Sequence, residues 1–373
     1  MSENTRRIST EGGLKVKEDI LIVGGYGAVG KHVVMELIKT CPEKIIIAGR
    51  NLEKAESFVK EVGQSLRVMQ LDIYNDEQLS EKLATVHSVV MCLEVTNTNF
   101  VEACIDRGVN YIDISASSAI PSKLKQLESK AIRSGVTCIL GVGIAPGLST
   151  LLAKKITSVM DQVDQLNFTL MLGLGEQHGS DGVKWFLSNL VTDYQINDTT
   201  IKPFINRFQA NLPAPLGVRK AYAFNLADQE IMSKTLSIPN VRTYFHYDSR
   251  LMTNLLHLLK RIGFFNLLKN SRIFNLFLKI FSSSLLSKGK SLTEAIVLHV
   301  KVTGRSRGKN LSYVGTIVGK SSSSLTGKIS AFVASELNQN AYPTGVYYLN
   351  EVMDLDPISS YLNNQIHVEI TQE

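Results

Sequence analysis

The chain has 373 residues, of which 20% are charged and 44% are hydrophobic, and its formal net charge is +6. This length allows two or more domains, and the composition is that of an ordinary globular protein. The mild positive charge favours anionic ligands, but no basic patch interleaved with aromatic residues points to a nucleic acid partner. The four cysteines lack the spacing of a metal site or a disulfide framework, so we expect neither.

The first 17 residues are polar, and we interpret them as a flexible tail and not as a secretory signal, which predicts a cytoplasmic protein. Residues 18–146 then alternate between apolar runs and helical patterns. Continuous apolar strands indicate burial on both faces, as in a parallel sheet between two helix layers. The expected strands are 20–24, 44–48, 66–73, 88–93, 111–114 and 136–142, and the expected helices after the first are 51–62, 76–84, 99–107 and 122–133. The fold class is therefore α/β, with a doubly wound (Rossmann) dinucleotide-binding domain.

The glycine motif after the first strand is the most informative feature of this domain. Gly25, Gly27 and Gly30 have the GxGxxG spacing, and a helical pattern follows. In such motifs the first glycine permits a tight turn, the second lets a pyrophosphate approach the backbone, and the third lets the helix pack closely on the strand. The N–H groups at the start of that helix face the phosphate charge.

The second strand ends at Gly49-Arg50, where an acidic residue would bind the ribose 2′-hydroxyl of NAD(H). A guanidinium suits a 2′-phosphate instead, so we predict NADP(H) as the cofactor. The residues expected to bind it are Gly25, Tyr26, Gly27, Ala28, Val29, Gly30, Arg50, Asn51, Asp72, Ile73, Leu93 and Thr96.

A different pattern begins after Pro146-Gly147 and predicts an α+β substrate or dimerisation domain over residues 147–327, with a largely antiparallel sheet. A helix is expected at 148–160 and an alternating strand at 163–173. Two further strands, 292–303 and 311–318, flank a cationic loop at 304–309. A last helix at 328–337 begins the C-terminal region 328–373. The sequence leaves open whether this region packs against the first domain.

The segment 251–290 contains seven Lys or Arg residues and no acidic residue, among many Leu, Phe and Ile. Its apolar stretches are too short to span a membrane. We weigh two core helices of the second domain against a surface that contacts an anionic membrane or a lipid-like substrate, and against a groove for a partner helix.

Two clusters carry residues for proton transfer. Asp113 ends the fifth strand, where it either acts on substrate or binds the backbone of the next turn. Glu176 and His178 follow the strand 163–173 in a glycine-rich stretch, which is either a site for a general acid or an exposed polar turn. We name His178, Asp113 and Glu176 as candidate catalytic residues, expect them to face the nicotinamide across the interdomain cleft, and expect no metal.

The chain resembles the saccharopine dehydrogenase-like family. The resemblance is carried by Gly24–Gly30, Ala48–Arg50, Val101–Asp113 and Gly141–Gly147, and at the C-terminal end by Thr344-Gly-Val-Tyr-Tyr and Glu351–Pro357. It implies an NADP-binding domain, a second α+β domain, and hydride transfer at an imine or amine carbon. Ala145 departs from the family, because many relatives have an acidic residue before Pro-Gly. This departure argues against an amino-acid substrate.

The sequence thus predicts an NADP(H)-dependent oxidoreductase that acts on the C=N carbon of a small metabolite, in a protein expected to be a homodimer. Reduction of an activated C=C in a lipid or polyketide-like substrate is an alternative, because the family includes members resembling trans-acting enoyl reductases. The competing class is a non-catalytic NADPH-binding protein that uses the segment 251–290 at a membrane or partner.

Overall fold

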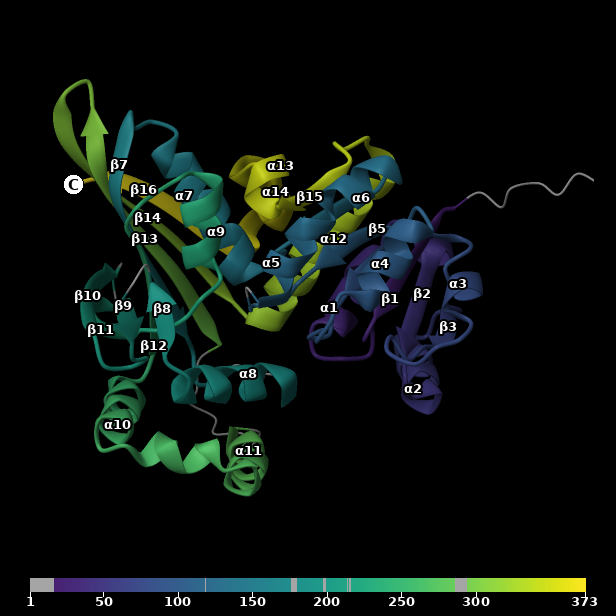
Figure 1. The fold of residues 1–373 in the computed structure, drawn as a ribbon, viewed down its shortest axis with the longest axis horizontal. Helices are drawn as coiled ribbons and strands as arrows, with labels where there is room; N and C mark the ends of the chain where they lie inside the picture. Colours follow the sequence, from purple (N-terminus) through teal and green to yellow (C-terminus); the bar gives the residue numbers. More distant parts are fainter. Residues whose placement is uncertain are drawn as a thin grey trace, which may run out of the picture.

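Figure 1 shows a computed structural model of the chain, with one large sheet toward each end of the molecule. The structure describes residues 17–117, 119–175, 180–196, 199–212, 214, 216–285 and 294–373. The long helix α12 (Ser322–Gln339) lies between the two sheets (Figure 1). A buried apolar cluster joins Ile22 of the first sheet and Ile329 of α12 to Val300 of the second sheet, so the three parts share one core.

The first sheet is parallel and has seven strands in the order β15-β6-β5-β4-β1-β2-β3. Its central strands are short apolar runs that are buried on both faces, as expected of a sheet covered by helices on each side. The predicted doubly wound α/β class is confirmed. The strands are β1 (Asp19–Val23), β2 (Ile45–Gly49), β3 (Arg67–Gln70), β4 (Val86–Met91), β5 (Asn110–Asp113), β6 (Thr137–Leu140) and β15 (Gly345–Tyr348).

The helices of this part follow local signals. The helix α2 (Leu52–Val62) begins where the Asn51 side chain accepts a hydrogen bond from Lys54 N (2.8 Å), and it ends at Gly63, whose φ of 71° is left-handed. The remaining helices are α1 (Gly30–Leu37), α3 (Leu79–Lys82), α4 (Asn99–Asp106), α5 (Ala119–Leu124) and α6 (Glu128–Arg133).

Two helix predictions in this part were wrong in extent. The helix expected over 76–84 is the single turn α3, because Asp76 accepts a hydrogen bond from Gln78 N (3.0 Å) and holds a turn before it. The helix expected over 122–133 is divided between α5 and α6 by a 3-10 turn, Lys125–Leu127. Strand β15 was not predicted at all.

The second sheet also has seven strands, in the order β10-β11-β12-β7-β13-β14-β16. Only the β12–β7 pair is parallel, and the other neighbours are antiparallel, so the predicted second α+β unit with a largely antiparallel sheet is confirmed. The strands are β7 (Gln162–Leu172), β10 (Arg207–Leu212), β11 (Gly217–Ala223), β12 (Val241–Tyr247), β13 (Ala295–Ser306), β14 (Lys309–Lys320) and β16 (Ile366–Gln372), and a separate pair joins β8 (Tyr194–Ile196) and β9 (Thr199–Ile201).

The cationic loop expected at 304–309 is mostly strand. Strands β13 and β14 pair in register as far as Ser306 and Lys309, and the turn consists of Arg307 and Gly308, which both have positive φ. The helix expected at 148–160 is α7 (Ser149–Thr157), and the one expected at 328–337 is the longer α12. This part also contains α8 (Ser180–Val191) and α9 (Asp228–Thr235).

The C-terminal region contributes to both sheets. Helix α12 packs against α1, β15 pairs with β6 of the first sheet, and β16 pairs with β14 of the second. Two short helices, α13 (Leu349–Val352) and α14 (Leu355–Leu362), connect them. We propose to keep the division into 18–146, 147–327 and 328–373, with the last part shared between the two sheets.

The segment 251–290 is described as far as Leu285. It forms α10 (Arg250–Arg261), the 3-10 helix η4 (Phe264–Lys269) and α11 (Ser271–Leu285), which lie together along one side of the second sheet (Figure 1). Phe265 and Leu268 are buried, whereas Leu251, Leu258 and Ile262 are 80%, 53% and 67% exposed. Within the described residues, no helix combines the length and the apolar character needed to cross a bilayer.

Candidate active site between the two sheets

A cavity of about 440 Å³ extends from the glycine turn of the first sheet to the second sheet. Its lining comes from four places: the glycine turn, the carboxyl ends of β4, β5 and β6, the face of the second sheet with α8, and the start of α12. The lining residues include Gly27, Ala28, Val29, Leu93, Glu94, Ser115, Ala145, Leu170, Leu172, Trp185, Phe186, Phe245, Tyr247, Ser322 and Thr326.

The glycine turn has the close packing that a dinucleotide site requires. A Cβ on Gly30 would lie 2.2 Å from the carbonyl oxygen of Gly24, so helix α1 can approach β1 only because residue 30 is a glycine. A Cβ on Gly27 would occupy the open side of the turn, 3.0 Å from the same oxygen. The left-handed turn residue is Gly24, with a φ of 78°, and not Gly25 as the motif predicted. Gly25 instead packs closely against Ile22 and Ile47.

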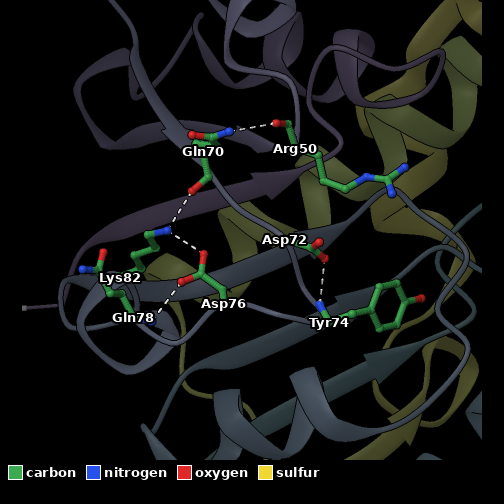
Figure 2. Close-up of polar contacts among 7 residues, drawn as sticks. All are labelled: Arg50, Gln70, Asp72, Tyr74, Asp76, Gln78 and Lys82. Carbon is green, nitrogen blue, oxygen red and sulfur yellow. Dashed lines mark hydrogen bonds and ion pairs between the residues drawn. The ribbon is translucent and has the colours of Figure 1, made fainter.

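Tyr26 and Asn51 organise the end of β2. The Tyr26 hydroxyl accepts a hydrogen bond from Asn51 N (3.2 Å), and its ring lies against Gly49, where a Cβ would come within 2.5 Å of the hydroxyl oxygen. The Arg50 backbone oxygen accepts from Gln70 Nε2 (3.2 Å), and Figure 2 shows the guanidinium extending away from that contact. An exposed guanidinium therefore stands at the expected 2′-phosphate position.

The segments that follow β3 and β4 hold the other predicted cofactor residues. Asp72 Oδ1 accepts a hydrogen bond from Tyr74 N (3.0 Å), as Figure 2 shows, and the Tyr74 hydroxyl accepts from Thr96 N (3.1 Å). These contacts tie the segment after β3 to the segment after β4. Ile73 is buried, whereas Thr96 is exposed and does not line the cavity.

Beside Gln70, the Lys82 ammonium bridges two parts of the same loop. It donates to the Gln70 backbone oxygen (2.9 Å) and to Asp76 (2.5 Å), and this ion pair is the first cause that lowers the pKa of the Asp76 carboxyl (Figure 2). The loop that follows β3 is therefore fixed by an ion pair and by a hydrogen bond to the backbone.

The fifth strand brings Asp113 to the edge of the cavity without exposing it. Asp113 is fully buried, and burial raises its pKa to about 6 although hydrogen bonds from Ser115 act in the opposite direction. Ser115 donates to it through both Oγ (2.8 Å) and N (3.2 Å). Ser115 lines the cavity and Asp113 does not, so the carboxyl holds the turn and orients the Ser115 hydroxyl.

The other two candidate catalytic residues, Glu176 and His178, lie outside the described residues. Trp185, on α8, lines the cavity and packs edge-on against Phe224, with ring centroids 5.7 Å apart.

Several cavity residues were not identified from the sequence. Glu94 lies three residues beyond Met91, the last residue of β4, and this position past the carboxyl end of a buried strand could have identified it. The wall of Leu170, Leu172, Phe245 and Tyr247 comes from one face of two neighbouring strands, which only the pairing of β7 with β12 brings together. Among the described lining residues Glu94 is the one carboxylate, and none is cationic.

The fold and the glycine turn define an α/β dinucleotide-binding protein, in which a second sheet faces the glycine turn across the cavity. Residues 20–139 match the family model "Saccharopine dehydrogenase NADP binding domain". The saccharopine dehydrogenase [NADP(+), L-glutamate-forming] of Schizosaccharomyces pombe is 30% identical over 137 residues, which are 36% of this chain and 29% of that protein. The Saccharomyces cerevisiae enzyme of the same name is 27% identical over 139 residues, 37% of this chain and 30% of its own length.

The structure of apo saccharopine dehydrogenase (L-Glu forming) from Saccharomyces cerevisiae covers 95% of this chain and 100% of its own, with a TM-score of 0.66 and 16% identity. At that identity the likeness concerns the fold. The sequence matches span less than a third of the curated relatives. The first domain of this chain is thus similar to the NADP-binding domain of saccharopine dehydrogenases, and NADP(H) is the cofactor that this similarity supports. The open side of the turn at Gly27 and the close helix packing that Gly30 permits fit that cofactor.

Proposed function

We propose that the protein is an NADP(H)-dependent oxidoreductase that reduces the C=N bond of a small, largely apolar imine. The observation that carries the proposal is the cavity, which runs without interruption from the glycine turn to the aromatic wall of the second sheet. When bound along the glycine turn, the cofactor supplies or accepts a hydride. The residues of this chain would hold the hydride acceptor, exclude water and compensate the charge on the substrate.

Glu94 favours an imine over other acceptors. A protonated imine carries positive charge on nitrogen, and a carboxylate in a cavity with few other charges stabilises that charge strongly. Reduction of a C=C conjugated to a carbonyl instead builds negative charge on oxygen, which a neighbouring carboxylate opposes. We assign Glu94 to the substrate nitrogen and the Ser115 hydroxyl, held by Asp113, to a hydrogen bond with the substrate.

The wall formed by Phe186, Phe245 and Tyr247 argues for an apolar or aromatic substrate body. A substrate with two or three carboxylates would require cations, and the described lining offers none. Ala145 has no charge with which to bind a substrate ammonium. These features support a cyclic or aryl imine that has no charged group besides the imine nitrogen over an amino acid conjugate.

The test is a panel of acceptors with purified protein and NADPH, followed by loss of NADPH absorbance. Cyclic and aryl imines should be reduced, and Glu94→Gln should lower kcat roughly ten- to a hundredfold while the NADPH Kd changes little. Ser322→Ala, on the α12 side of the cavity, is the matched polar control. Faster turnover of α,β-unsaturated carbonyl compounds would replace the proposal with C=C reduction of a lipid-like or polyketide-like substrate, the candidate that the apolar wall also accommodates. Turnover of neither class would favour a non-catalytic NADPH-binding protein.

We also propose that the α10–α11 surface, formed by Leu251, Leu255, Leu258, Ile262, Leu267, Ile273 and Leu276, contacts an anionic lipid membrane. The exposed residues Leu251, Leu255 and Leu258 of α10 and Ile262, which caps its C-terminal end, recur at helical spacing and form one apolar stripe. Residues 251–290 contain no acid. Lys260 binds Leu190 O and Asp193, so the cations that this proposal uses are the exposed Arg261, Lys269, Arg272 and Lys279.

A further inference from the structure

A second cavity, of about 350 Å³, lies on the second sheet near the start of α10. Strands β11 and β12 pair only at Tyr222–Phe245 and Ala223–Tyr244, so toward Gly217 the two strands separate. The first turns of α10 cover the space that this separation opens. The lining residues are Arg207, Gln209, Val218, Arg219, Lys220, His246, Tyr247, Arg250, Thr253 and Asn254.

The cavity gathers four cations and no lining carboxylate. Burial and the nearby charge of Arg250 both lower the pKa of Arg219, so these cations repel one another. Arg250 donates to the backbone oxygen of Val218 (3.3 Å), and within the described residues none of Arg207, Arg219 and Lys220 forms an ion pair. Asp248 attracts Arg219 from outside the lining, but its carboxylate also accepts from Leu174 N and Ser249 N.

Two buried nitrogens in this cluster lack partners within the described part of the chain. They are Arg219 Nε and His246 Nε2. His246 is 1% exposed, and its Nδ1 donates to the Tyr247 backbone oxygen (2.9 Å), so in the neutral ring Nε2 is an acceptor. An unpartnered acceptor beside guanidinium donors matches an anion that still carries a hydroxyl, as the singly ionised form of a phosphate monoester does.

The start of α10 adds to the positive potential. Ser249 caps this helix by accepting from Met252 N, and no acidic residue stands in its first turn. The helix therefore presents the positive end of its dipole, together with Arg250, to a cavity that has no acidic residue among its described lining residues.

We propose that this cavity binds the phosphate group of a small organic phosphate. The guanidinium of Arg219 and the ammonium of Lys220 contact the phosphate oxygens, and His246 Nε2 accepts a hydrogen bond from a phosphate or neighbouring hydroxyl. The volume exceeds that of the phosphate group alone, which leaves room for an organic body. Tyr247 lines both this cavity and the one between the two sheets, so a bound phosphate ester contacts the wall of the candidate active site.

The probe is inorganic phosphate, titrated by calorimetry at constant ionic strength into full-length protein saturated with NADPH. Wild type should bind saturably, and Arg219→Gln and Lys220→Gln should each weaken binding roughly tenfold or more. Lys309→Gln, at the far hairpin of the second sheet, is the matched control and should bind as wild type does. Because Lys220 is exposed, its variant tests the site even if Arg219→Gln fails to fold.

Absence of saturable phosphate binding by wild type would overturn the proposal, as would equal losses in the Lys309→Gln control. A second arm uses neutral vesicles with and without phosphatidylinositol 4-phosphate. Binding of free phosphate together with Lys220-dependent vesicle binding would identify a lipid headgroup as the source, whereas phosphate binding without vesicle binding would identify a free metabolite. Vesicle binding that is independent of both Arg219 and Lys220 would assign that contact to another surface and count against this cavity.

Discussion

The phenolic oxygen of Tyr26 lies 2.5 Å from the position that a Cβ on Gly49 would occupy. The ring of Tyr26, in the glycine turn after β1, therefore occupies the space that a side chain at Gly49, at the end of β2, would need. The same hydroxyl accepts from Asn51 N, so Tyr26 also fixes the backbone on either side of Arg50.

This contact predicts the effect of Gly49→Ala. The added methyl group overlaps the Tyr26 ring, and relief by a small shift of the ring would break its bond to Asn51, so the variant should lose about 1–3 kcal/mol of unfolding free energy. In the double variant with Tyr26→Ala the overlap disappears. Urea denaturation of the four proteins should give a coupling energy above about 0.5 kcal/mol, whereas additive losses would contradict the contact.

Arg50→Ala tests the choice of cofactor. Removing a guanidinium that pairs with a phosphate should cost roughly 1.5–3 kcal/mol, so NADPH should bind about ten- to a hundredfold more weakly while NADH binding changes little. Titration of both cofactors into both proteins measures the difference. Equal losses for NADPH and NADH, or a wild type that prefers NADH, would be incompatible with the assigned role.

Two glycines of the turn should behave differently on substitution. Gly27→Val fills the side of the turn that the pyrophosphate approaches, so cofactor binding should be lost while the fold is kept. Gly30→Ala instead places a Cβ 2.2 Å from Gly24 O and should destabilise the first sheet itself. Circular dichroism and calorimetry separate the two outcomes. Normal NADPH binding by Gly27→Val would mean that the site is placed wrongly.

Asp113 makes stability depend on pH. Burial raises its pKa to about 6, and an Asp in an unfolded chain titrates near 3.9, so between these values the folded protein keeps a proton that the unfolded chain releases. Unfolding free energy therefore falls as pH rises from about 4 to about 6, by up to about 3 kcal/mol from this group, and stays lower above that range.

Asp113→Asn removes this contribution. Relative to wild type, the variant should gain stability as pH rises from 4 to 7, whatever offset the lost Ser115 contacts cause. Asp228 is the matched comparison, since burial also raises its pKa to about 6. Denaturation curves at several pH values give the difference directly, and a pH-independent difference between Asp113→Asn and wild type would show that Asp113 is charged in the folded state.

The proposed membrane contact predicts sedimentation with anionic liposomes at low salt and release at high salt, because screening acts over about 10 Å at 0.1 M. Leu258→Glu should abolish sedimentation by placing an acid in the exposed stripe of α10. Leu236→Glu, an exposed leucine at the end of α9, should have no effect. Sedimentation that persists in Leu258→Glu would exclude this surface as the contact.

The sequence predicted most of the first sheet, because its strands are continuous apolar runs and Gly30 and Asn51 are local signals for the helices that follow. It could not predict β15, a strand of four residues whose partner β6 lies some two hundred positions earlier. Gly304, Arg305 and Ser306 suggested a loop because their composition is typical of turns, yet pairing with β14 extends the strand through them.

The candidate site likewise contains residues that the sequence could identify and residues that it could not. Arg50 and the glycine turn follow a motif, so they could be identified in advance. Glu94, Tyr247 and the cationic cavity depend on which strands are neighbours and where β11 separates from β12, and these are tertiary relationships. Ser115 follows the predicted fifth strand, but its importance depends on Asp113 being buried beneath it.

The position of β15 has a consequence for biosynthesis. Strand β6 can pair on its outer side only after residues 345–348 have left the ribosome, so during translation the first sheet carries an open edge of apolar residues. Open edges of this kind associate with other chains. The nascent protein should consequently depend on chaperones until residues 345–348 have been synthesised, and truncation before Gly345 should yield a chain that aggregates although all six earlier strands of that sheet are present.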